Sequence, residues 1–165
     1  MSKECTKCGA SSLKSVAPAL YHYKLSGLDN VYLKGGVTEF ICPKCGTKST
    51  AIKNVIGLHK AIAKTLAVAK RRLTGGELRF LREQIGFSAE ELGNLVEYNE
   101  DHIRKIETGS MNPKGPYEMF LRVAAMRDIQ APEYDLHELV ERREYELEDL
   151  KFVNKNREWE MATVA

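Results

Sequence analysis

Two short cysteine motifs constrain the fold of this chain more than any other feature. Cys5 and Cys8 lie in CTKCG, Cys42 and Cys45 lie in CPKCG, and the sequence has no further cysteine. Each C-x-x-C step offers two thiolates to one tetrahedral ion, because a tight turn brings residues three apart to the same side. A glycine follows each motif and permits the sharp turn past the second sulfur. The spacing therefore predicts one structural zinc ion held by all four cysteines.

Three other uses of the cysteines compete with a metal site. A redox dithiol calls for a reactive pair beside a βαβ pattern, which the sequence lacks. A disulfide framework suits an oxidising compartment, whereas MSKECTK has no apolar region of the kind a secretory signal needs, so a cytoplasmic location is expected. Unliganded buried thiols are the third alternative. If zinc binds, four thiolates close its coordination sphere, which predicts a structural ion and not a catalytic one.

The segment between the cysteine motifs predicts a small sheet. ALYHYKL, NVYL and VTEFI are rich in β-forming residues and predict short strands, and KGG predicts a hairpin turn before the last of them. We therefore expect a zinc-binding β domain over residues 1–54.

Residues 55–74 predict a basic amphipathic connector helix between two domains. Its apolar stripe consists of Leu58, Ile62, Leu66, Ala69 and Leu73. Its cations are Lys60, Lys64, Lys70, Arg71 and Arg72. Basic residues exceed acidic ones by ten in residues 1–75 and fall short by eight in residues 76–165, for a formal net charge of +2. This asymmetry favours a polyanionic partner, with two solvated surfaces of opposite sign as the alternative.

Residues 75–129 contain the start signals of three helices. Thr74 with Glu77 and Ser88 with Glu91 match capping boxes, and Asn99 is a good N-cap. Apolar residues face one core: Leu78, Leu81, Ile85, Leu92, Leu95, Val96, Ile103 and Ile106. A helix, a short turn and a second helix from about residue 100 to 107 predict a helix-turn-helix. The expected fold class is α+β, a zinc-binding β domain followed by an all-α helix-turn-helix domain.

The stretch LRFLREQIGFSAEELGNLVEYNEDHIRKIETGSMNP resembles the Xre/Cro repressor family, in which the pattern LRxLRxxxGxSxxELxxxLxxxxxxIxxIExG recurs. To about residue 127, the paired CxxCG motifs, SGLDNVYLKGG, a linker and an Xre domain resemble the MqsA-type, or YgiT-type, zinc-finger antitoxins. That resemblance implies a structural zinc, an N-terminal domain that binds a toxin, and a C-terminal domain that dimerises on palindromic operator DNA.

The expected function is that of a sequence-specific DNA-binding regulator, an antitoxin-like autorepressor that acts as a homodimer on two half-sites. The alternative is a zinc-stapled interaction module that neutralises a toxin or other partner, with weak or no specific DNA binding. An enzyme is not expected, because the sequence offers no nucleophile with its base, no phosphate loop and no open metal position.

Candidate DNA contacts lie at the start of the second helix and in the connector: Asn99, Glu100, Asp101, His102, Arg104, Lys105, Arg71 and Arg72. Arg104 and Lys105 match positions that face DNA in the zinc-finger antitoxins. The two carboxylates at 100 and 101 are awkward beside phosphates. Glu97 occupies the turn position usually held by glycine, where a positive φ would cost roughly 1 kcal/mol or more, so a reshaped turn is expected.

The C-terminal part predicts an acidic helical tail over residues 130–165. EYDLHELVERREYELEDLK, residues 133–151, has leucines near heptad spacing, and residues 154–165 are expected to be frayed. The longest apolar stretches are short and interrupted by lysine, so no transmembrane helix is expected.

Overall fold

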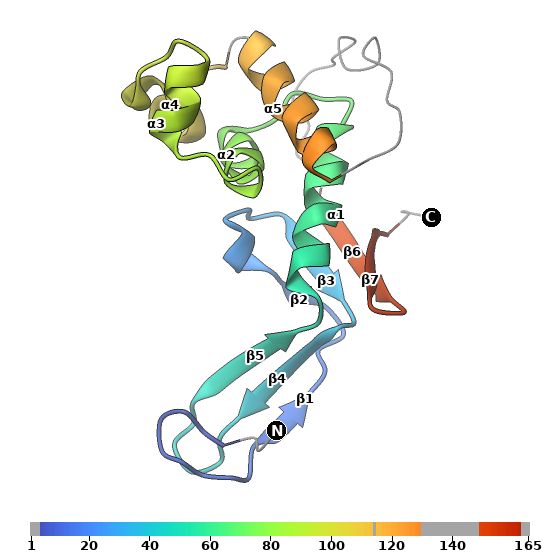
Figure 1. The fold of residues 1–165 in the computed structure, drawn as a ribbon. Helices are drawn as coiled ribbons and strands as arrows, with labels where there is room; N and C mark the ends of the chain where they lie inside the picture. The colour runs from blue at the N-terminus through green and yellow to red at the C-terminus, as the bar shows by residue number, and fades with distance from the viewer. Residues whose placement is uncertain (1–3, 114, 130–148, 163–165) are drawn as a thin grey trace.

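A computed structural model describes residues 4–113, 115–129 and 149–162. Those residues form two small β-sheets and five α-helices, which confirms the α+β class (Figure 1). Helix α1 (Val55–Ala67) runs between the sheet that carries the cysteine motifs, at one end of the molecule, and the remaining helices at the other (Figure 1). Within the described ranges, no helix has the length and apolar character needed to cross a membrane.

The first sheet contains strands β1 (Lys14–Val16), β4 (Val37–Ile41) and β5 (Lys48–Ile52), antiparallel in the order β1-β4-β5. We call this sheet with the two cysteine turns the finger. Strand β1 is exposed throughout, β5 is exposed except for its half-buried last residue, and β4 fully buries only Val37. The finger therefore has almost no hydrophobic core of its own.

The second sheet contains β2 (Tyr21–His22), β3 (Val31–Lys34), β6 (Leu150–Lys155) and β7 (Glu158–Met161), in the order β2-β3-β6-β7. Strands β3 and β6 are parallel, and the other two pairs are antiparallel. The prediction of a helical, frayed tail is wrong for residues 150–161, which form this hairpin. The predicted helix over 133–151 lies outside the described residues except for its last three positions.

The KGG turn is not a hairpin, because β3 and β4 belong to different sheets. Gly35 (φ 76°) and Gly36 (φ 68°) turn the chain from one sheet into the other. A Cβ atom on Gly36 would lie 2.9 Å from Cβ of Asn154 and 3.0 Å from Cζ2 of Trp159. Glycine is therefore required here both by its backbone conformation and by the close approach of the C-terminal hairpin.

Helix α1 is a packed element of a shared core and not a free connector. Its buried residues are Leu58, Ile62, Ala63, Leu66 and Ala67, which join one cluster with the second sheet and the other helices. The phenol of Tyr23, from the β2 side, lies 2.8 Å from Nε2 of His59 on α1. The predicted helix over 55–74 ends at Ala67, so Lys70, Arg71 and Arg72 lie outside it.

Buried charge fixes the segment between α1 and α2 (Gly75–Gln84). Arg122, on α5 (Gly115–Asp128), is 1% exposed and forms an ion pair with Glu118 at 2.9 Å. Its guanidinium also donates to four carbonyl oxygens, those of Leu66, Ala67, Ala69 and Arg71. Because these carbonyls end α1 and begin the next segment, Arg122 acts as a buried cap for the helix.

The predicted helix starts are confirmed. Capping boxes begin α2 at Thr74 and α3 (Ala89–Leu95) at Ser88. The Asn99 side chain accepts a hydrogen bond from the His102 amide at 2.7 Å and begins α4 (Glu100–Glu107), whose bounds agree with the prediction. Glu97, in the turn before it, has a positive φ of 58°, so this residue adopts the backbone conformation for which glycine is usual, at the cost noted above.

Candidate metal centre and nucleic-acid interface

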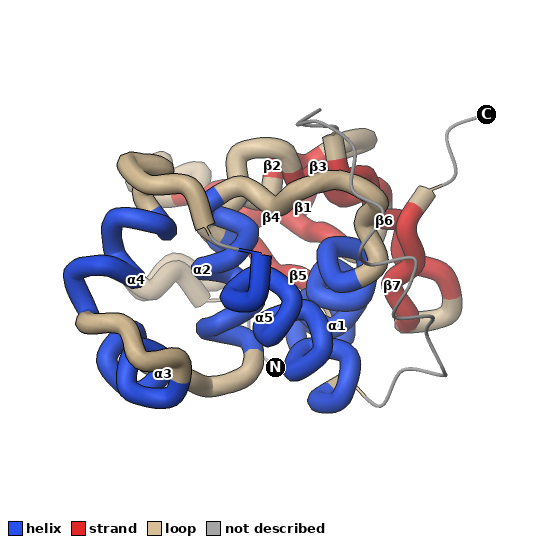
Figure 2. The backbone as a smooth tube through the Cα atoms, turned by 90° about the horizontal axis from the view of Figure 1, so that it is seen from above, coloured by secondary structure: helices blue, strands red, loops and turns tan. Residues whose placement is uncertain are grey.

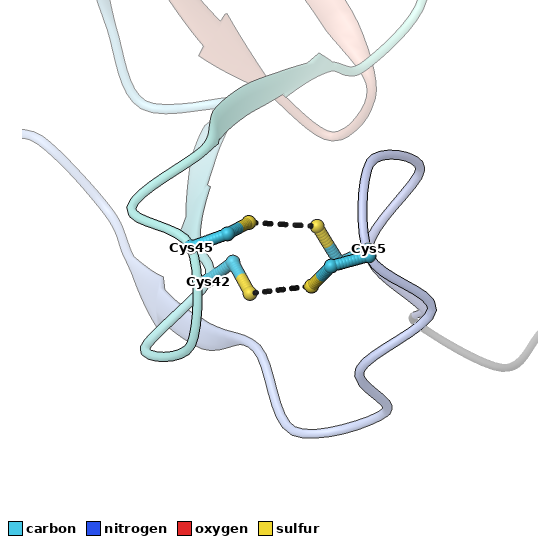
Figure 3. Close-up of side chains that lie close together, drawn as sticks. Cys5, Cys42 and Cys45 are labelled. Carbon is cyan, nitrogen blue, oxygen red and sulfur yellow. Dashed lines mark hydrogen bonds between the residues drawn. The ribbon is translucent and has the colours of Figure 1, made fainter.

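The four cysteines converge at the tip of the finger (Figure 3). Their Sγ atoms all lie within 4.8 Å of one another, with Cys5 to Cys45 at 3.5 Å and Cys8 to Cys42 at 3.6 Å. In a tetrahedral zinc site with Zn–S bonds of about 2.3 Å, sulfur atoms lie about 3.8 Å apart. The described thiols are free, not joined in disulfides. This arrangement can hold one metal ion.

Both cysteine turns have the same backbone geometry. The amide of Gly9 donates to the carbonyl of Cys5, and the amide of Gly46 donates to the carbonyl of Cys42, each at 2.9 Å. Both glycines have φ 69°. The amide of the first cysteine in each turn donates to the carbonyl five residues later, at 2.8 Å and 3.0 Å. The repeated CxxCG motif thus builds two equivalent turns that face each other across the sulfur cluster.

Local hydrogen bonds favour thiolate at two of the sulfurs. The hydroxyl and the backbone amide of Thr47 lower the pKa of Cys45 to about 6. Backbone amides of Lys7 and Cys8 lower the pKa of Cys5. The amide of Ala10 lowers the pKa of Cys8. Hydrogen bonds of Cys8 with Cys45 and Cys42, together with burial, outweigh this effect and raise the pKa of Cys8 to about 12. The cluster therefore shares protons unevenly among its thiols, and a bound dication would release them.

The second candidate site is the outer face of α4. Ile103 and Ile106 are buried on one side, whereas Asp101, Arg104 and Lys105 are exposed on the other. Two carboxylates begin the helix and two cations stand in its last turn, the order that the helix dipole favours. His102 is half-buried and lies against the ring of Tyr98, with centroids 4.3 Å apart. Figure 2 shows α4 on the side of the molecule away from β6 and β7.

Close backbone contacts fix the position of α4. A Cβ on Gly75 would lie 2.6 Å from the carbonyl oxygen of Glu107, so the start of α2 packs directly on the end of α4. A Cβ on Gly93 would lie 2.6 Å from the carbonyl oxygen of Tyr98 in the turn before α4. Arg82 forms a two-pronged ion pair with Glu107, at 2.5 Å and 2.9 Å. In the sequence, Gly75 indicates only a break between elements and Gly93 gives no signal, because nothing local distinguishes a packing glycine from a flexible one.

The two connector arginines have different environments. Arg71 is half-buried, and its guanidinium pairs with both oxygens of Glu77, at 2.6 Å and 2.8 Å. Arg72 is exposed and lies three residues before Gly75, which contacts the end of α4. Arg72 is therefore accessible, whereas Arg71 is held in an internal ion pair.

Comparison of the chain with protein-family models, with curated proteins and with solved structures found no match.

Proposed function

We propose that the chain is a DNA-binding transcriptional regulator of the antitoxin type, in which α3, the turn over residues 96–99 and α4 act as a helix-turn-helix. The observation that carries this proposal is the orientation of α4. Its apolar side is buried by Ile103 and Ile106, and its polar side, with Arg104 and Lys105, is free to enter a major groove. The buried ion pair of Arg82 with Glu107 supports the helix from behind.

The DNA contacts that we propose come from three side chains: Arg104, Lys105 and Arg72. All three are exposed, and Arg72 precedes the glycine that packs on the end of α4. Asn99 is assigned a capping role, since its side chain is bonded to the His102 amide. Arg71 is left out because its guanidinium is bonded to Glu77. The carboxylate of Asp101 repels phosphate, so we expect a modest affinity for DNA. Because the proposed contacts are made by cations, this affinity should decrease as the salt concentration increases.

The first test is fluorescence-anisotropy binding to DNA from immediately upstream of the gene, against scrambled DNA, across a salt series. We expect the wild type to prefer the native fragment. Arg104→Ala/Lys105→Ala should lose at least tenfold in affinity, with a salt slope smaller by at least about one. The control Lys60→Ala/Lys64→Ala removes the same charge from the exposed side of α1. Equal losses in both double variants, or no preference for the native fragment, would contradict the proposal.

We also propose that the ion in the finger is zinc. Four thiolates in a tetrahedral arrangement suit zinc or iron, and a closed set of four sulfurs suits a structural role. Iron would give the protein visible absorption and a redox potential, and zinc would give neither. Elemental analysis of the purified protein distinguishes the two.

A homodimer fits two half-sites, and the outer face of α5 is our candidate interface. A groove of about 570 Å³ lies there between α2 and α5, lined by apolar residues that include Ile85, Phe120 and Val123. Arg127 and Asp128 also line this groove. Across a two-fold axis, Arg127 of each copy could pair with Asp128 of the other copy.

For this interface we expect Val123→Glu to shift the protein from dimer to monomer in sedimentation velocity. Val123 is only half-buried in the isolated chain, so the variant should keep its helical circular dichroism. Binding to a full operator should weaken with the loss of the second half-site. A variant that stays dimeric would place the interface elsewhere.

A second candidate function is capture of a toxin or another protein through the N-terminal part. Leu20 and Leu25, on either side of β2, are 52% and 79% exposed, which favours an apolar partner surface there. Two results together would favour this second candidate. The protein would bind native and scrambled DNA equally weakly, and Leu25→Ser would abolish co-purification of the protein encoded by the adjacent gene.

A further inference from the structure

An acidic residue and a basic residue on the exposed side of α4 form one unit. Oε1 of Glu100 accepts two hydrogen bonds from Arg104, from Nε at 3.0 Å and from Nη2 at 2.5 Å. The side chains are 43% and 64% exposed, respectively. An exposed pair of this kind contributes little to stability. Its effect is instead to fix the direction in which the long arginine side chain points.

The contact uses only one edge of the guanidinium. Arginine has five N–H donors, and the Nε hydrogen and one Nη2 hydrogen are taken by Glu100. The second Nη2 hydrogen and one Nη1 hydrogen remain as a parallel pair on the outer edge. This pair matches the O6 and N7 acceptors that guanine presents in the major groove.

The neighbouring carboxylate provides an internal contrast. Asp101 and Lys105 have the same spacing on α4, yet no ion pair joins them in the part of the chain that the structure describes. Asp101 is exposed and contributes only negative charge to this face. Of the two acids, only Glu100 therefore contacts a cation that could read a base.

We propose that Glu100 is a positioning residue that holds Arg104 in place for bidentate recognition of guanine in each half-site. This inference rests on the proposed DNA-binding function and names the base that α4 reads. The carboxylate weakens the attraction of α4 for phosphate. It also restricts the Arg104 side chain before binding, so less conformational entropy is lost when the complex forms. Glu100 then acts on specificity more than on affinity.

The experiment begins with selection by the wild-type protein from duplexes with a randomised core, at low salt. Each guanine in the selected duplex is then replaced in turn by 7-deazaguanine, which lacks the N7 acceptor. We expect one replacement per half-site to weaken wild-type binding about tenfold. Arg104→Lys should keep most of the attraction to phosphate. It should bind the guanine duplex and the 7-deazaguanine duplex with similar affinity, because lysine lacks the planar pair of donors.

Glu100→Ala and Asp101→Ala are a matched pair, since each removes one carboxylate from α4. Both should bind phosphate somewhat better and unfold at similar urea concentrations. Only Glu100→Ala should reduce the discrimination against 7-deazaguanine, from about tenfold to about two- or threefold, whereas Glu100→Gln, which keeps an oxygen acceptor, should retain most of it.

The outcomes separate this inference from the proposed function. Equal discrimination in Glu100→Ala and Asp101→Ala, or selected duplexes without a guanine that depends on Arg104, overturns the role of Glu100 and leaves DNA binding in place. Failure of the wild type to bind any duplex at low salt overturns the proposed function itself, and this inference with it.

Discussion

Stripping the metal from the four-cysteine site is expected to unfold the finger and to leave the helices folded. Beyond the cysteines, β1, β4 and β5 bury only Val37, so the sheet has little apolar area to offset its conformational entropy. A structural zinc site contributes about 10–16 kcal/mol of apparent free energy in small peptides. A bound ion would therefore be the main stabilising contact of this sheet.

Amide hydrogen exchange with and without a strong chelator measures this effect. We expect amides of β1, β4 and β5 to lose protection, whereas those of β3 and α1 keep it, because Val31, Leu33 and the α1 leucines belong to the shared core. Adding zinc back should restore the pattern, and Cys45→Ser should reproduce the chelated state. Unchanged exchange in the finger would contradict a structural ion. Global unfolding would contradict the separation between finger and core.

The second large effect is expected from Arg122→Leu, which should lower the free energy of unfolding by about 3–5 kcal/mol. The substitution takes the guanidinium from the buried carboxylate of Glu118 and from four carbonyl oxygens between Leu66 and Arg71. Domains of this size unfold at a total cost of about 5–15 kcal/mol, so the variant should be close to unfolding. Urea denaturation followed by circular dichroism measures the change.

The chain contains a matched control for that prediction. Glu100 and Arg104 form the same kind of pair, four residues apart on one helix, but on the surface. Arg104→Leu should change the free energy of unfolding by no more than about 1 kcal/mol. Similar losses in the two variants would show that burial does not decide the effect. Replacing Arg122 and Glu118 together by apolar residues should recover part of the loss, because no buried carboxylate then remains at this pair.

Features set by nearby residues could be predicted from the sequence. The capping boxes at Thr74 and Ser88, the N-cap at Asn99 and the two cysteine turns each depend on residues within about five positions. Their hydrogen bonds form within one turn of chain, so a short motif specifies them almost completely. This is why the bounds of α4 and the geometry of each cysteine turn agree with expectation.

Features set by distant partners could not be predicted. Residues 150 and 151 are predicted as the end of a charged helix, and residues 154–165 as a frayed end. Their strand structure depends on pairing with β3, more than a hundred positions earlier. Arginine is usually a surface residue, so the sequence of α5 does not predict that Arg122 is buried. Its burial depends on hydrogen bonds to the carbonyls at the end of α1. Gly35 and Gly36 mark a turn in the sequence, but which sheet each flanking strand joins is decided by tertiary pairing.

The parallel pairing of β3 with β6 also bears on how the protein is made. β3 spans Val31–Lys34 and leaves the ribosome more than a hundred residues before its neighbour β6, which begins at Leu150. Until then Leu33 and Val31 lack the side chains of Phe152 and Leu150 beside them. The nascent chain therefore carries an incomplete apolar edge while the residues between β3 and β6 are synthesised, a state that attracts chaperones and proteases. Any product that terminates before β6 is expected to be degraded instead of accumulating as a shortened protein.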